Sequence, residues 1–144
     1  MRNRHLLGRL ALVAGCCAVC MALGCDGMVG VEGWVVEAPP GEKSDVTMKE
    51  KRMDQPQEGV IQNAWVELWT GNGKRLLERQ EPGLAKDGFF GVGKVGPYER
   101  GMRYLIKAGA PGYQPLSKEV KLRVGGDSAL IQLAPIKQED GRGQ

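Results

Sequence analysis

The 144-residue sequence predicts an all-β protein, namely a seven-stranded antiparallel sandwich that follows a signal peptide. Apolar and polar residues alternate in short runs, which is the period of strands that bury one face. Gly, Pro and Asp separate these runs, and the chain contains 22 Gly and 8 Pro, which indicates frequent turns. No run has the apolar spacing of a long amphipathic helix.

Residues 1–24 are predicted to be an export signal. Three arginines precede an uncharged apolar run that ends in Ala22-Leu23-Gly24-Cys25, and this layout matches the charged, apolar and cleavage regions of a secretory peptide. The run is shorter than the about 20 apolar residues that a membrane-spanning helix needs. Cys25 stands where a bacterial lipoprotein carries its diacylglyceryl anchor, so we expect residues 25–28 to form a lipidated tether.

Cys16 is the alternative lipid acceptor, because Val13-Ala14-Gly15-Cys16 also resembles a lipoprotein cleavage site. Cleavage there would leave an apolar region of six residues, below the roughly 7–15 residues of a normal signal. Cys25 is therefore preferred, and the mature chain then has no free thiol for a disulfide or a zinc site. We expect an anchor in the cell membrane or outer membrane, with the domain facing the periplasm or the cell exterior.

The mature chain is expected to bind no nucleic acid, metal or cofactor and to catalyse no reaction. Without residues 1–24 it has 17 basic and 17 acidic residues, and this neutral balance lacks the field that attracts nucleic acid. The only histidine, His5, falls in the signal, so no imidazole remains as a general base or zinc ligand. Pairs of carboxylates are inevitable by chance at this acid content and indicate no glycosidase by themselves.

One domain is predicted over residues 29–135. Its clearest strand spans residues 60–70, where Ala64, Val66 and Leu68 alternate with Trp65, Glu67 and Trp69. The Asp87-Gly88 pair predicts a tight turn between two strands. The other strands are expected at residues 29–37, 75–80, 84–86, 89–95, 102–110, 117–124 and 129–133, which makes seven or so short strands in all.

Residues 38–58 interrupt this domain with a charged insert that is expected to be flexible. The insert holds three prolines and few large apolar residues, a composition that does not bury itself in a core. A connection of this length is uncommon inside a compact domain. The polar tail over residues 136–144 is expected to fray.

Several short motifs follow one another in a recognisable order: Gly30-Val31-Glu32-Gly33-Trp34-Val35, Ile61-Gln62-Asn63-Ala64-Trp65-Val66-Glu67-Leu68, Asp87-Gly88-Phe89-Phe90, Tyr104-Leu105-Ile106-Lys107-Ala108 and Pro111-Gly112-Tyr113. In this order they resemble the carboxypeptidase regulatory-like domain over most of residues 29–135. The resemblance implies a seven-stranded transthyretin-like (prealbumin-like) sandwich with an accessory or adhesion role, and it carries over no catalytic residue. The family usually has a short turn where this chain has residues 38–58.

The candidate binding surface consists of Trp34, Trp65, Glu67 and Trp69, which are expected to face outward. Indole rings combine apolar area with an N–H donor and are enriched at binding sites. Two rings four residues apart on a strand are about 13 Å apart. Either these rings bind an envelope protein or a polysaccharide, or residues 38–58 cover them and the domain is a passive structural spacer.

Overall fold

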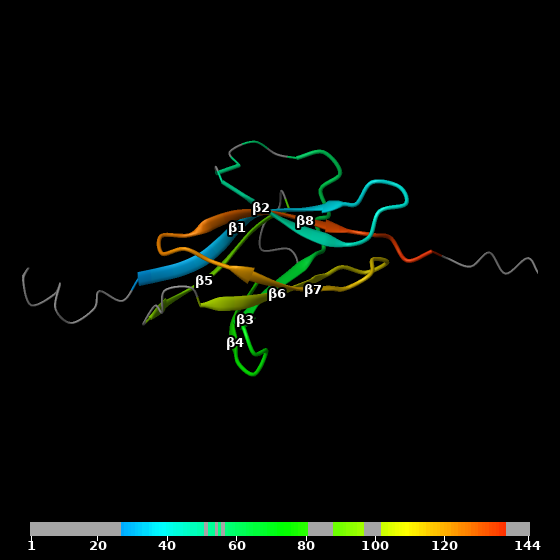
Figure 1. Ribbon diagram of the computed structural model, residues 1–144. Helices are drawn as coiled ribbons and strands as arrows, with labels where there is room; N and C mark the ends of the chain where they lie inside the picture. Colours follow the sequence, from blue (N-terminus) through cyan, green and yellow to red (C-terminus); the bar gives the residue numbers. More distant parts are fainter. Residues whose placement is uncertain are drawn as a thin grey trace, which may run out of the picture.

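A computed structural model describes residues 27–50, 52–53, 55, 57–80, 88–96 and 102–137. These residues form eight strands in two four-stranded sheets that enclose one core (Figure 1), which confirms the expected all-β fold. They include no helix long and apolar enough to span a membrane. The expected signal peptide, the acceptor candidates Cys16 and Cys25, the strand at 84–86 and tail residues 138–144 lie outside the described residues.

The first sheet has the strand order β2-β8-β1-β5. Its members are β1 (Gly27–Glu37), β2 (Asp45–Lys49), β5 (Phe89–Gly96) and β8 (Asp127–Leu133). β1 is central and pairs antiparallel with β5 but parallel with β8, so the expectation of a wholly antiparallel sandwich is wrong at this pair. β1 and β8 are the first and last described strands, and no tight hairpin forces them to run in opposite directions.

The second sheet has the strand order β4-β3-β6-β7, and all its pairs are antiparallel. Its members are β3 (Trp65–Thr70), β4 (Leu76–Gln80), β6 (Arg103–Gly109) and β7 (Leu116–Lys121). β3 starts later than residue 60, where the sequence places its beginning. Residues 60 and 61 instead lie alongside β1, where Val60 forms a bridge with Val36 and the Ile61 N–H donates to the Val35 carbonyl at 2.8 Å.

Alternate side chains of both sheets meet in the core. The most deeply buried large residues, all below 2% exposure, are Val35, Val66, Leu68, Ile106, Ile131 and Leu133. Each such side chain contributes about 1.5–3 kcal/mol by leaving water. Because Val66 and Leu68 point into this core, their neighbours on β3 must point to the outer face of the second sheet.

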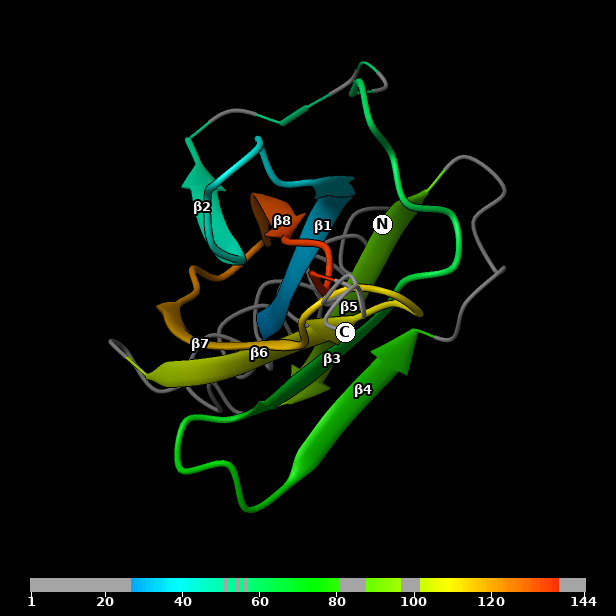
Figure 2. The ribbon, with the colours of Figure 1, turned by 90° about the vertical axis from the view of Figure 1, so that its right-hand side faces the viewer.

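Part of the insert at residues 38–58 is ordered as β2, so the expectation of a flexible segment is wrong there. β2 pairs with β8 at the edge of the first sheet (Figure 2). Val46 is 3% exposed and Met48 packs against the core. Two apolar residues two positions apart are enough to hold an edge strand when the adjacent strand of the same sheet offers backbone N–H and C=O groups for pairing. The surrounding prolines and charges obscure this short pattern in the sequence.

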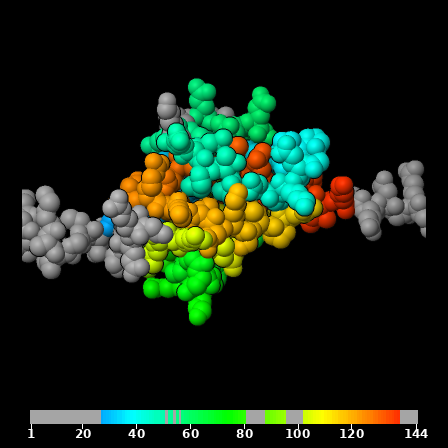
Figure 3. Space-filling view, viewed as in Figure 1, coloured from blue at the N-terminus to red at the C-terminus, as the bar shows by residue number. Residues whose placement is uncertain are grey.

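A lysine from β7 joins β2 to the second sheet. Lys118 Nζ donates to Asp45 Oδ1 at 2.5 Å and to the Val46 carbonyl at 2.9 Å. The surfaces of β2 (cyan to green) and β7 (orange) accordingly lie against each other in Figure 3. This side of the sandwich is therefore closed by a side chain that bonds to the main chain of an edge strand.

Candidate functional site

β3 carries Trp65, Glu67 and Trp69 on the outer face of the second sheet, as the alternation of its residues predicts. Both rings are half-buried, whereas Glu67 is only 8% exposed. A carboxylate on an outer face is usually solvated, so its burial shows that neighbouring side chains surround it.

Glu67 connects these side chains through both of its carboxylate oxygens. Trp69 Nε1 donates to Glu67 Oε2 at 2.7 Å, and Arg79 Nη1 donates to Glu67 Oε1 at 3.0 Å. Arg79 lies directly across from Glu67 in the register of β3 and β4. Charge-assisted bonds of this kind are stronger than neutral ones. Glu67 therefore fixes the geometry of the surface, and its oxygens already have partners.

Each tryptophan ring also meets a cation from a neighbouring strand. Arg79 Cζ is 5.4 Å from the centroid of the Trp65 ring, and Lys107 Nζ is 4.1 Å from that of Trp69. Both distances are within the range of cation–π attraction. A Cβ atom on Gly109 would come within 2.7 Å of Trp65, so this ring lies across the bare backbone of β6. The rings are consequently held rigidly against the sheet.

On the outer face of the second sheet, the described strands carry more bases than acids. Arg103 pairs with Glu119 at 2.6 Å, as Arg79 pairs with Glu67, and Lys107 and Lys121 add further positive charge on the same face. These four bases and two acids are placed by the register of β3, β4, β6 and β7. The tryptophan surface, by which we mean Trp65, Glu67, Trp69, Arg79 and Lys107, is therefore aromatic and positively charged.

Trp34 does not belong to this surface, and the expectation that it is exposed is wrong. It lies on the other sheet and is 4% exposed, with its ring edge-on to Phe89 at a centroid distance of 5.2 Å. Arg52 from the insert pairs with Glu32 on the same face of β1 at 2.9 Å. This ion pair places Arg52 of the insert on the face of β1 that carries Trp34. The period of a strand predicts which face a residue is on, but not what packs over that face.

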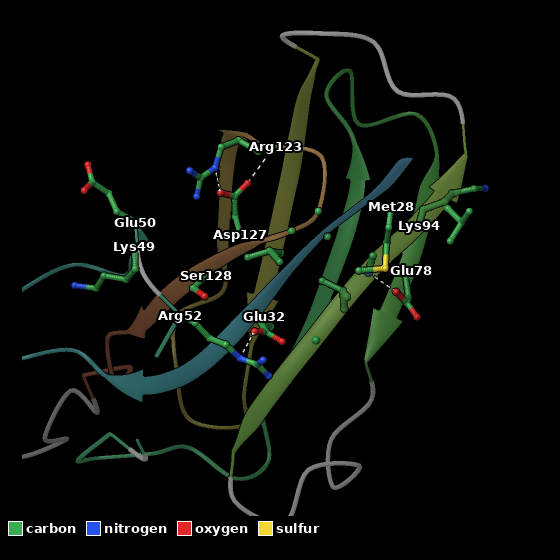
Figure 4. A pocket seen from close by; sticks show the side chains of 18 residues that line it. Met28, Glu32, Lys49, Glu50, Arg52, Glu78, Lys94, Arg123, Asp127 and Ser128 are labelled. Carbon is green, nitrogen blue, oxygen red and sulfur yellow. Dashed lines mark hydrogen bonds and ion pairs between the residues drawn. The ribbon is translucent and has the colours of Figure 1, made fainter. Parts of the chain in front are cut away.

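A groove of about 700 Å³ opens on the first sheet, beside the first half of β1 (Figure 4). Gly30, Gly91 and Gly93 leave its floor without side chains. The charged groups along it are largely engaged with one another, as in the pairs Arg52–Glu32 and Arg123–Asp127 that Figure 4 shows. The Gly-x-Gly pattern of β5 is the sequence signal for this groove, but its side chains do not converge on a common point.

A smaller cleft of about 420 Å³ lies near the end of β1. In it the Tyr113 hydroxyl donates to Glu37 Oε2 at 2.8 Å. This hydrogen bond, followed by desolvation and the negative charge of Glu37, raises the pKa of Tyr113. Elsewhere the hydrogen bond from Lys118 lowers the pKa of Asp45. Neither shift moves the group toward neutral pH, where a general acid or base would operate.

The sequence matches no model of a known protein family and no curated protein. In the part of the chain that the structure describes, no three His, Cys, Asp or Glu side chains lie together as metal ligands. The feature with the best-defined geometry is the tryptophan surface, whose two rings are half-exposed and lie beside the cations Arg79 and Lys107. Such a surface can bind a ligand by apolar contact and charge.

Proposed function

We propose that this protein is a lipid-anchored cell-envelope protein whose sandwich binds a partner protein and catalyses no reaction. The observation that carries the proposal is the position of Trp65 and Trp69, half-exposed on an outer sheet face against which no described strand packs. Aromatic residues and arginine are enriched at protein interfaces and supply much of their binding energy. Rigid side chains also lose little conformational entropy on binding.

The anchor belongs to the same proposal. Cys25 is two residues before the first residue of β1, so a lipid on Cys25 would hold the sandwich close to the membrane. We further propose that the sandwich is a carboxypeptidase regulatory-like domain of the transthyretin type, in which β2 is an added edge strand. The order of the sequence motifs supports this family, and the insert that contains β2 is where the sequence departs from it.

The chemistry of the tryptophan surface favours a protein with acidic groups over a polysaccharide. Two rings on one strand could stack on alternate sugar units, which supports a carbohydrate-binding role as the second candidate. However, the Trp69 N–H is already bonded to Glu67, and Arg79 and Lys107 lie close to the two rings. Acidic side chains of a protein would pair with these cations while apolar ones contact the ring edges.

Photocrosslinking in cells tests the proposal. The crosslinker replaces Leu105, which is the partner of Trp69 on β6 and lies on the same face, so both tryptophans stay in place. The control is position 47, exposed on the outer face of β2 in the other sheet. We expect a discrete protein adduct from position 105 that is absent from position 47. A smear digested by glycan-cleaving enzymes would support the polysaccharide role, and no adduct would support a passive spacer.

Two sets of variants complete this test. Trp65→Leu with Trp69→Leu should abolish the adduct from position 105 while the protein stays folded, because both rings lie outside the core. Cys25→Ser should release the protein from the membrane fraction. If only Cys16→Ser released the protein, Cys16 would be the lipid acceptor. If the protein stayed in the membrane fraction in both variants, the lipid anchor would be contradicted.

A further inference from the structure

The end of the sandwich where β1 begins exposes large apolar side chains. Five such side chains are exposed in the described ranges, and three of them are at this end. Met28 is 53% exposed, Val95 65% and Val124 51%. Figure 1 shows the start of β1, the end of β5 and the β7–β8 connection together at one end of the molecule. We call Met28, Val95 and Val124 the apolar end.

The main chain holds the apolar end in place. Met28 and Val95 are cross-strand partners in the pairing of β1 with β5. Val124 forms a bridge with Val29, and the next amide, that of Gly125, donates to the Met28 carbonyl at 2.9 Å. A Cβ atom on Gly27 would come within 2.8 Å of Val124 Cγ1, so Val124 packs on the backbone where β1 starts. The backbone positions of these three residues are therefore fixed.

Two carboxylates near the apolar end, those of Asp127 and Glu78, accept local hydrogen bonds. The Asp127 carboxylate accepts from the Arg123 side chain at 2.6 Å and from the Arg123 amide at 2.6 Å. Glu78, which lies beside Met28 in Figure 4, accepts from the Gly93 amide. Lys94 adds an exposed positive charge next to Val95. Among the described residues, the end thus combines apolar side chains with the cation of Lys94, and the carboxylates of Asp127 and Glu78 already have hydrogen-bond donors.

The short length of chain between Cys25 and the start of β1 indicates which surface this end would meet. Two residues span at most about 7 Å, and a lipid on Cys25 places that residue at the boundary between acyl chains and headgroups. The headgroup layer itself is roughly 5–7 Å thick on each side of a bilayer. Met28, its partner Val95 and the adjacent Val124 are then within reach of this layer. Apolar side chains with a neighbouring lysine are suited to that environment.

We propose that the apolar end rests in the interfacial layer of the bilayer that anchors Cys25. The proposal rests on the lipid anchor proposed above and adds an orientation. β1 would rise from the membrane, and the tryptophan surface on the side of the sandwich would stay accessible to a partner. The bilayer would cover side chains that are otherwise exposed to water.

Fluorescence quenching by lipid in vesicles tests this proposal. The full chain is produced with its signal and purified in its processed, lipidated form, then reconstituted into vesicles of phosphatidylethanolamine and phosphatidylglycerol. When Cys25 is acylated, the mature chain has no free thiol, so a single cysteine at position 95 or 124 takes one fluorophore. The control is position 136, because Ile136 is 54% exposed and the segment that follows β8 leaves the sandwich at the end opposite the start of β1 (Figure 1).

We expect lipids that carry a quencher near the headgroup to quench positions 95 and 124 several-fold more than position 136. Val95→Glu should reduce quenching at position 124 to the level of position 136, because a carboxylate is disfavoured at the interface. Ile136→Glu is the matched control and should leave quenching at position 124 unchanged.

Flotation of the vesicles separates the two proposals. Protein that floats with the vesicles but is quenched equally at all three positions would overturn the membrane contact and leave the anchor standing. Protein that does not float would overturn both. Protection of positions 95 and 124 from a water-soluble quencher in cells, without quenching by lipid in vesicles, would indicate a protein on this end and would also overturn the proposal.

Discussion

Gln80 on β4 forms a hydrogen bond to Gly91 on β5, the edge strand of the opposite sheet. The Gln80 side-chain oxygen Oε1 accepts from the Gly91 amide at 2.6 Å. Its Nε2 donates to the carbonyl of Phe89 on the same strand at 3.2 Å, and Glu78 accepts from the next outward amide, that of Gly93. β4 thus bonds the free edge of β5 through side chains, as Lys118 bonds β2 on the opposite side. Unpaired edges invite aggregation, and the sandwich closes both sides in this way.

The first prediction concerns this closure. Gln80→Leu should lower the free energy of unfolding by about 1–3 kcal/mol, because two main-chain groups of β5 lose their hydrogen bonds. It should also promote self-association through the released edge. Urea unfolding and analytical ultracentrifugation measure the two effects. Gln62→Leu, at an exposed glutamine, is the control, and equal behaviour of both variants would show that Gln80 does not close the edge.

The second prediction concerns the parallel pair in the first sheet. A Cβ atom on Gly33 would lie 1.8 Å from the carbonyl oxygen of Ala129, its partner on β8. Gly33→Ala should therefore cost at least about 3 kcal/mol or prevent folding, because main-chain atoms cannot move aside easily. Gly91→Ala is the matched control on β5, since its Cβ would meet nothing within 4 Å. Circular dichroism during thermal unfolding compares the two, and similar melting temperatures would contradict the β1–β8 pairing.

The third prediction separates the buried tryptophan from the exposed ones. Trp34→Ala should destabilise the protein by about 3–5 kcal/mol, as expected for a large side chain removed from a packed site. Trp69→Ala should cost only about 1–2 kcal/mol, because it removes one hydrogen bond and one cation–π contact from a half-exposed ring. Chemical unfolding of both variants provides the comparison. An equal loss would make Trp69 part of a core, which would exclude the tryptophan surface as a binding site.

The fold could be predicted from the sequence wherever the deciding interactions are local. The alternation from Ala64 to Trp69 reports which side of β3 is buried, so the placement of Trp65 and Trp69 was predictable. The parallel pairing of β1 with β8 was not, because it joins segments about a hundred residues apart and no turn residue marks it. β2 was also missed, since its two apolar residues stand among the charges and prolines of the insert.

The candidate site was predictable only in part, for a similar reason. Strand period placed Glu67 beside the two indoles, but it could not show that Arg79 and Lys107 would complete the surface, because they come from neighbouring strands. Trp34 is not part of the surface because it is buried on the other sheet, and the period of its strand does not show what packs over that face. Cross-strand neighbours and covering segments are set by tertiary pairing, which a single sequence does not reveal.

The fourth prediction concerns acid. The hydrogen bond from Lys118 lowers the pKa of Asp45 below its ordinary value of 3.8, so the folded state favours the carboxylate. The bond between Lys118 and the Asp45 carboxylate contributes fully to stability above about pH 4, and this contribution is lost as the pH falls through the lowered pKa. The side chain of Asp45 is 54% exposed, so we expect Asp45→Asn to cost less than about 1 kcal/mol at neutral pH.

Urea unfolding from pH 7 down to pH 2 measures this contribution. The difference between the native protein and Asp45→Asn should narrow below about pH 4 as Asp45 becomes protonated. A difference that stays constant to pH 2 would mean that the charge of Asp45 plays no part.

The last prediction concerns base, at the opposite end of the pH range. Glu37 accepts a hydrogen bond from the neutral Tyr113 phenol, and this bond raises the pKa of Tyr113 above its ordinary value of 10.0. A raised pKa gives a contribution that is complete below about pH 10 and is lost as the pH rises through the folded-state value. Tyr113→Phe should therefore be less stable by about 0.5–1.5 kcal/mol at neutral pH, and this loss of stability should shrink in alkali.

An ultraviolet titration measures the pKa of Tyr113. Subtracting the titration of Tyr113→Phe from that of the native protein isolates the Tyr113 phenol, and Glu37→Ala should move the midpoint of that titration down toward the ordinary value. A midpoint that does not move would show that the hydrogen bond between Tyr113 and Glu37 is not formed in solution.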